Sequence, residues 1–68
     1  MSNLFNPPKF VNGSLDGIDG NAFVLMSHFK MIAKRQGWKN NEIKSVIDKC
    51  MSGTYDQLIQ TLLCHMKD

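Results

Sequence analysis

The sequence predicts an all-α protein in which three short helices lie behind an irregular or β-hairpin N-terminal arm. Apolar residues recur with helical spacing in three separate segments after residue 20. Both prolines and three of the five glycines fall within residues 1–20, where helix formers are few. With 68 residues the chain makes one domain at most. We therefore expect an N-terminal arm at 1–20 and a three-helix domain at 21–68.

The arm carries a hairpin signal in the stretch KFVNGSL. Its Asn12-Gly13 pair stands between short apolar segments, which favours a tight hairpin turn. A two-stranded ribbon is not stable alone. We therefore expect the apolar residues of the arm to lie across the helices or across a neighbouring subunit; these residues are Leu4, Phe5, Phe10, Val11, Leu15 and Ile18.

The first helix is predicted from Asn21 to about Gln36. Gly37 suits its C-terminal cap, because glycine readily adopts the left-handed conformation that ends many helices. The positions with helical spacing are Ala22, Leu25, Met26, Phe29, Ile32 and Ala33. Outside this face Phe23, Val24 and Met31 form a second apolar strip, which we expect to be an oligomer interface.

The second helix is expected to start near Asn40 and to end near Ser52 and Gly53. The sequence TYDQ then forms a capping box in which Thr54 and Gln57 cap each other's backbone amides. The third helix follows. The residues predicted to point inward are Ile43, Val46, Ile47, Cys50 and Met51 on the second helix, and Leu58, Ile59, Leu62, Leu63 and Met66 on the third.

The small size and the cysteine content favour self-association. Cys50 and Cys64 both fall on apolar helix faces, so we interpret them as reduced thiols of an intracellular protein. Without a disulfide or metal staple, a chain this short gains most by burying surface against a partner subunit. A homo-oligomer is therefore predicted.

The charge is modest but unevenly distributed. The segment 28–49 carries six basic residues and two acids, which gives +4, whereas each flanking segment comes to −1 and the whole chain to +2. A locally positive middle favours anions at that surface. No apolar run is long enough to span a membrane and no lipidation signal is present, so we expect no membrane partner and a soluble protein of the cytoplasm.

No catalytic or metal-binding set is recognisable, and we expect neither an enzyme nor a cofactor. Ser27 and His28 are adjacent in a helix and do not share a face, and the same holds for Cys64 and His65. Both histidines are interpreted as surface or boundary residues. The pair Asp16 and Asp19 supplies too few ligands for a divalent metal.

The stretch GIDGNAF, residues 17–23, has two interpretations. In the first, Asp19 or Asn21 caps the helix and the glycines only allow the turn. In the second, the unpaired amides and the helix dipole around Gly20 and Asn21 hold a phosphate or carboxylate, with Phe23 beside it. Residues that favour a nucleotide as the anion are Lys30, Lys34 and Arg35, which offer charge, and Trp38 and Tyr55, which offer flat faces for a base.

Two segments, DGNAF at 19–23 and SGTYDQLIQTLL at 52–63, together with RQGW at 35–38, resemble a widespread family of small phage and bacterial helical proteins. Members pair a Gly-Asn-Ala-Phe segment with a Ser-Gly-Asp-Tyr-Asp-His segment. This chain carries Thr54 and Gln57 where the family usually has aspartate and histidine. Small phage proteins of this general kind include oligomeric sponges that sequester cyclic nucleotide signals of bacterial antiphage defence.

The resemblance implies a non-enzymatic binding protein acting in the cytoplasm of a bacterial host. On this hypothesis Trp38 or Tyr55 stacks on a base and Asp56 accepts a hydrogen bond from a base edge. An alternative is a small adaptor or inhibitor that docks a host protein through Phe23, Val24 and Met31. A third is a DNA-binding regulator that uses Lys34 and Arg35.

Overall fold

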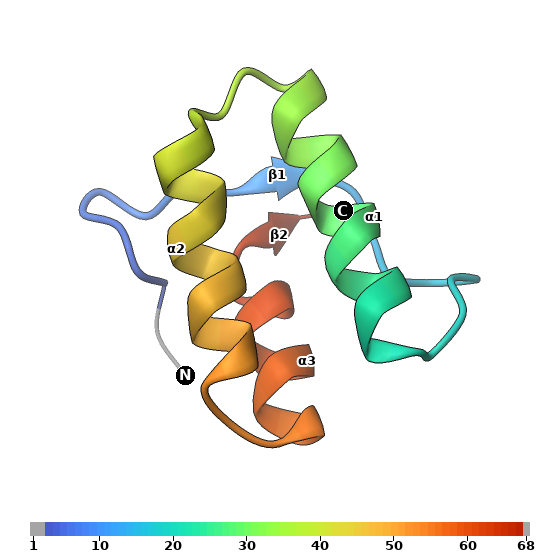
Figure 1. Cartoon of the computed structure of the whole chain (residues 1–68). Helices are drawn as coiled ribbons and strands as arrows, with labels where there is room; N and C mark the ends of the chain where they lie inside the picture. The colour runs from blue at the N-terminus through green and yellow to red at the C-terminus, as the bar shows by residue number, and fades with distance from the viewer. Residues whose placement is uncertain (1–2, 68) are drawn as a thin grey trace.

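Three helices and a very short parallel sheet make up the structure, a computed structural model that describes residues 3–67. The elements follow the chain in the order β1 (Val11–Asn12), α1 (Ala22–Arg35), α2 (Asn40–Met51), α3 (Tyr55–Leu63) and β2 (Met66–Lys67). Figure 1 shows the sheet between α1 and α2, with α3 below it. The three helices confirm the prediction, and the protein is mostly helical rather than all-α.

The helix ends are fixed by the capping residues that the sequence marks. Asn21 caps α1, and its side chain accepts the N–H groups of Phe23 at 2.9 Å and Val24 at 3.4 Å. At the other end Gly37 has φ +89°, and the N–H of Trp38 donates to the carbonyl of Ala33 at 3.0 Å. This is the Schellman arrangement, in which a left-handed residue turns the chain back onto the last turn of the helix.

The third helix begins with the predicted capping box. The hydroxyl of Thr54 accepts the N–H of Gln57 at 3.2 Å, and the side chain of Gln57 accepts the N–H of Thr54 at 2.9 Å. At the start of α2, the carboxylate of Glu42 accepts the N–H of Lys39 at 2.8 Å. Both helices therefore satisfy an otherwise unpaired backbone donor within their own first turn.

The predicted hairpin at Asn12 and Gly13 is wrong. Val11 and Asn12 pair in parallel with Met66 and Lys67, so the arm pairs with the last residues of the domain instead of folding back on itself. The N–H of Gly13 donates to the carbonyl of Lys67 at 2.7 Å and thereby extends the ladder. On the other edge of β1, the side-chain amide of Gln36 accepts the N–H of Asn12 and donates to its carbonyl, both at 2.8 Å. An amide side chain thus takes the place of a third strand.

The core lies where the three helices meet the sheet. Val11, Phe29, Val46 and Leu62 have no exposed surface, and the remaining buried hydrophobic residues surround them. Two positions predicted to point inward do not, since Met51 is 60% and Leu63 47% exposed. Both stand at a helix end, because Met51 is the last residue of α2 and Leu63 the last residue of α3.

His65 is fully buried, which corrects its interpretation as a surface or boundary residue. Its Nδ1 lies 2.7 Å from the carbonyl oxygen of Thr61, and its Nε2 accepts the N–H of Leu4 at 3.0 Å. A carbonyl only accepts and a backbone N–H only donates, so the imidazole is the neutral tautomer with its proton on Nδ1. Burial lowers the pKa of His65 below its ordinary value of 6.5. The side chain therefore fastens the arm to the end of α3.

Candidate functional site

Five of the residues predicted to form one binding site lie in two groups at opposite ends of α1. Gly20, Asn21 and Phe23 are at its beginning, while Lys34 and Arg35 are in its last turn. At 1.5 Å per residue, the helix axis places the two groups about 18 Å apart. Lys30 lies between the groups. The structure therefore does not bring the predicted cations to the predicted backbone loop within one chain.

The first group borders a cleft between the beginnings of α1 and α3. The hydroxyl of Tyr55 donates a hydrogen bond to the carbonyl of Gly20, which joins the two segments DGNAF and SGTYDQ in space. We call this space the α1–α3 cleft. Its volume is about 360 Å³, and it is lined by Ala22, Phe23, Met26, Cys50, Met51, Gly53, Thr54, Tyr55 and Leu58.

Aromatic and thioether side chains form the exposed walls of the α1–α3 cleft. Phe23 is 72% exposed, Met51 60% and Tyr55 48%. An exposed aromatic face is available to stack on a planar ring. Asp56 is also exposed, in the first turn of α3 next to Tyr55. Sequence reasoning included Phe23 and Tyr55 but missed Met51, which its helical stripe assigned to the core.

The backbone amides at the start of α1 are largely occupied by the protein itself. Asn21 accepts the amides of Phe23 and Val24, and the carboxylate of Asp19 accepts the N–H of Asn21 at 2.8 Å. This confirms the cap interpretation of GIDGNAF. A phosphate at Gly20 and Asn21 would have to displace these acceptors.

The second group presents positive charge at the far end of α1. Lys30, Lys34 and Arg35 are exposed, and among the described residues none of them forms an ion pair. The cations that do are Lys9, whose Nζ lies 3.0 Å from the carboxylate of Glu42, and Lys44, at 2.6 Å from Asp48. The charge of the last turn of α1 is therefore not neutralised by an ion pair within the described residues.

Trp38 is a core residue. It is only 6% exposed, and the rings of Phe5 and Phe29 meet it edge to face with centroids at 5.5 Å in each case. The ammonium group of Lys9 lies 5.2 Å from the centre of its ring. Its faces are therefore taken up by the protein, and in this conformation no base can stack on it.

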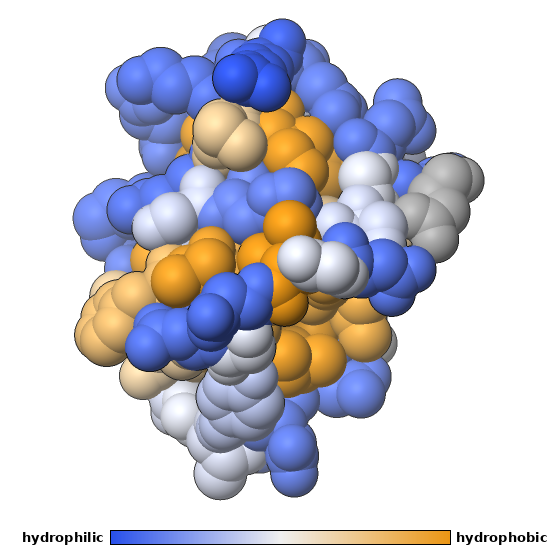
Figure 2. Space-filling view, turned by 90° about the vertical axis from the view of Figure 1, so that its right-hand side faces the viewer, coloured by the Kyte–Doolittle hydropathy of each residue, from blue (hydrophilic) through white to orange (hydrophobic). Residues whose placement is uncertain are grey.

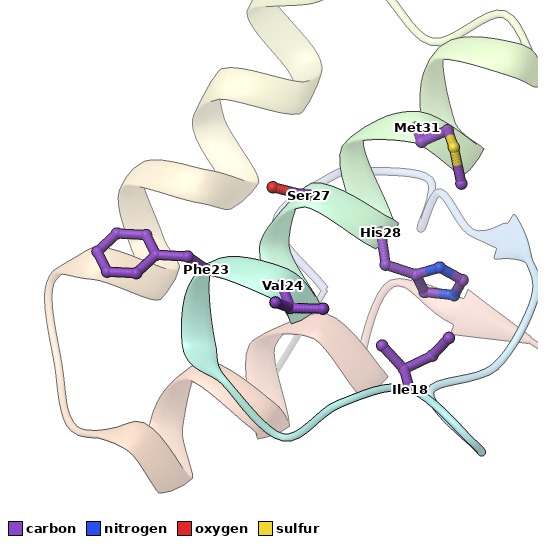
Figure 3. A pocket seen from close by; sticks show the side chains of 6 residues that line it. All are labelled: Ile18, Phe23, Val24, Ser27, His28 and Met31. Atoms are coloured by element: carbon purple, nitrogen blue, oxygen red, sulfur yellow. The ribbon is translucent and has the colours of Figure 1, made fainter.

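A second hollow runs along the outer face of α1. This α1 groove has a volume of about 420 Å³ and is lined by Ile18, Phe23, Val24, Ser27, His28 and Met31 (Figure 3). Val24 and Met31 are 42% and 46% exposed. Ile18 approaches from the preceding loop, and that loop is held by His28, whose Nε2 lies 2.9 Å from the carbonyl oxygen of Ser14. The groove confirms that Phe23, Val24 and Met31 are left exposed as one strip.

The surface over α1 divides by polarity. In Figure 2, hydrophobic residues gather across the middle of the face that carries α1, and hydrophilic residues cover its upper part, where α1 ends in Figure 1. Phe23 lines both the α1 groove and the α1–α3 cleft, so the two hollows share a wall. The sequence predicted the strip and predicted that Ile18 would lie across the helices, as it does, but the loop that carries Ile18 has no periodicity that would assign it to this groove.

The reactive side chains are placed for structure. Burial raises the pKa of the Cys50 thiol to about 11, so this sulfur stays protonated near neutral pH and is a poor nucleophile. Both ring nitrogens of His65 are engaged by backbone groups. Within residues 3–67, no group of three or more histidine, cysteine or acidic side chains could hold a metal ion.

Comparison of the chain with protein-family models, with curated proteins and with solved structures gives no match. None of the helices in the described part of the chain has the length and apolar character that crossing a membrane requires.

Proposed function

We propose that this is a non-enzymatic binding protein that holds a small ligand with a flat ring and an anionic group, of the cyclic nucleotide class, in the α1–α3 cleft. Sequestering such a ligand, as the phage sponge proteins do, requires affinity without turnover. One observation carries the proposal: Phe23 and Tyr55 stand exposed on the walls of the same cleft, on the two segments that prompted the phage resemblance.

The charges around the cleft partly favour and partly oppose a bound anion. The N-terminal ends of α1 and α3 both border it, and each contributes partial positive charge. Asp19 and Asp56 lie near the same helix starts and oppose an anion. Lys34 and Arg35 are about 18 Å away along α1, so the phosphate needs cations from elsewhere. The cleft itself binds the base.

Calorimetric titration of the purified protein with a panel of cyclic mono- and dinucleotides tests the proposal. We expect a saturable ligand whose affinity falls about 5-fold to 150-fold in Phe23→Ala, because stacking on one aromatic ring contributes roughly 1–3 kcal/mol. Leu63→Ala is the matched control, since Leu63 is similarly apolar and 47% exposed but does not line the cleft. Absence of binding across the panel, or equal affinity in both variants, would refute it.

A second candidate is an adaptor or inhibitor that docks a host protein in the α1 groove. It is favoured by the exposure of Phe23, Val24 and Met31 on one helix face. If the protein is such an adaptor or inhibitor, the groove is exposed in the purified protein and becomes covered only when the host protein binds. Met31→Asp should then abolish partner capture in a pull-down.

A further inference from the structure

The exposed face of α1 carries an apolar strip in its middle, with the cation Lys30 beside it, and opposite charges at its two ends. The loop before the helix carries Asp16 and Asp19, both exposed, and the last turn carries Lys34 and Arg35, also exposed. Among the described residues, none of these four side chains forms an ion pair. Such a face is complementary to itself when a second copy runs in the opposite direction.

We propose that two copies of the chain pair through their α1 grooves in antiparallel orientation, about a two-fold axis at Ser27. Ser27 lies in the middle of the groove, and its small side chain allows the helices to approach to about 8–10 Å. Counting outward from Ser27 along the helix, this register sets Phe23 against the partner's Met31. It also brings Lys34 and Arg35 of one copy to the start of the partner's α1, where the preceding loop carries Asp19 and Gly20.

Charge selects a second copy in this orientation over other arrangements. A parallel pair would bring Lys34 and Arg35 against the same cations of the partner, with nothing to neutralise them. The antiparallel pair places opposite charges at both ends and apolar side chains between them, as a self-complementary interface requires. Phe23 is the natural anchor, since it is the most exposed large hydrophobic residue described.

Pairing also joins the two separated halves of the binding site. Lys34 of one copy arrives beside Gly20 and Phe23 of the other, at the edge of the α1–α3 cleft, and Arg35 offsets the carboxylate of Asp19. The cleft of one chain would then take its phosphate-binding cations from the partner. This last step rests on the proposed function, whereas the pairing itself does not.

Sedimentation velocity over a range of protein concentrations tests the pairing. The wild-type protein should reach the mass of a dimer, and Met31→Asp should weaken self-association at least about 100-fold, because it buries a charge opposite Phe23. Met31 is 46% exposed, so the variant should keep its helical circular dichroism. A wild-type monomer at about 100 µM, well above the dissociation constant of a stable dimer, overturns the proposal, as does a dimer indifferent to Met31→Asp.

The orientation is tested by charge exchange. A Lys34→Glu and Arg35→Glu variant should pair weakly alone, and so should an Asp16→Lys and Asp19→Lys variant, whereas a mixture of the two should form a heterodimer. Lys49→Glu is the matched control, since Lys49 is exposed on α2 and away from the groove. Ser27→Cys should form a disulfide across the two-fold axis under mild oxidation, and Ser45→Cys should not. No heterodimer in the mixture refutes the antiparallel register.

Titration with cyclic di-AMP as one member of the nucleotide panel separates the two proposals. A dimer that binds no nucleotide refutes the binding function and leaves the pairing intact. A monomer that binds nucleotide refutes the pairing alone. A monomer whose groove captures a host protein supports the adaptor function and overturns the pairing.

Discussion

Lowering the pH from 7.5 to 5 should destabilise the protein through His65. The buried imidazole accepts the N–H of Leu4 at Nε2 and donates from Nδ1 to Thr61. A second proton would face the Leu4 N–H donor directly and would place a charge among buried groups, including the ring of Phe5, whose centroid is 5.8 Å away. Protonation of His65 is therefore unfavourable in the folded protein unless the arm is released.

The sign and size of the effect follow from the lowered pKa of His65. The unfolded chain takes up this proton near the ordinary value of 6.5, before the folded chain does, so the stability contribution is complete above that pH. It is lost as the pH falls from 6.5 toward the lowered pKa of the folded state. One proton corresponds to at most about 1.4 kcal/mol per pH unit, or roughly 6–11 °C in Tm for a domain of this size.

Thermal unfolding followed by circular dichroism between pH 7.5 and 5 measures this slope. The window stays above the range in which Glu42 titrates, because a backbone hydrogen bond from Lys39 and the nearby Lys9 hold its pKa below 4.5. His65→Gln removes the titratable group and should lose the slope, whereas His28→Gln leaves His65 in place and should keep it. A slope that survives in His65→Gln would refute the reasoning.

Two further predictions concern the helix end and the buried thiol. Gly37→Ala should lower the free energy of unfolding by about 1 kcal/mol, because φ +89° is strained for any side chain. Chemical denaturation measures this free energy, and Gly20→Ala is the control because the φ of Gly20 is not positive. Native Cys50, whose pKa is raised to about 11, should react with a thiol reagent at pH 8 only at the rate of unfolding; fast modification identified at Cys50 by peptide mass mapping would contradict its burial.

The helices were predictable because their signals are local. Asn21, Gly37 and the pair Thr54 and Gln57 act within one turn of their own position, and the structure confirms each of them. The parallel pairing of Val11 with Met66 joins distant parts of the chain, and no local pattern distinguishes it from a hairpin at Asn12 and Gly13.

The candidate site was predictable as a list of residues but not as an arrangement. Phe23 and Tyr55 do meet at one cleft, yet Trp38 is enclosed by rings from the arm and from α1. The division between the start of α1 and its last turn follows from helix length alone. The sequence does not display this separation directly. Lys34 and Gly20 are near one another in the chain, but α1 holds them at its opposite ends.

The short sheet ties completion of the fold to residues made long after the arm. Val11 is fully buried and is made early, but its strand partner, Met66, follows all three helices in the chain. Likewise, the side-chain amide of Asn3 donates to the carbonyl of Cys64 at 2.9 Å, and the N–H of Leu4 donates to the imidazole of His65. While the chain is still growing on the ribosome, the helices can form one after another, but β1 lacks its strand partner. The nascent chain must therefore carry an incompletely covered apolar arm until Met66 and Lys67 have been made.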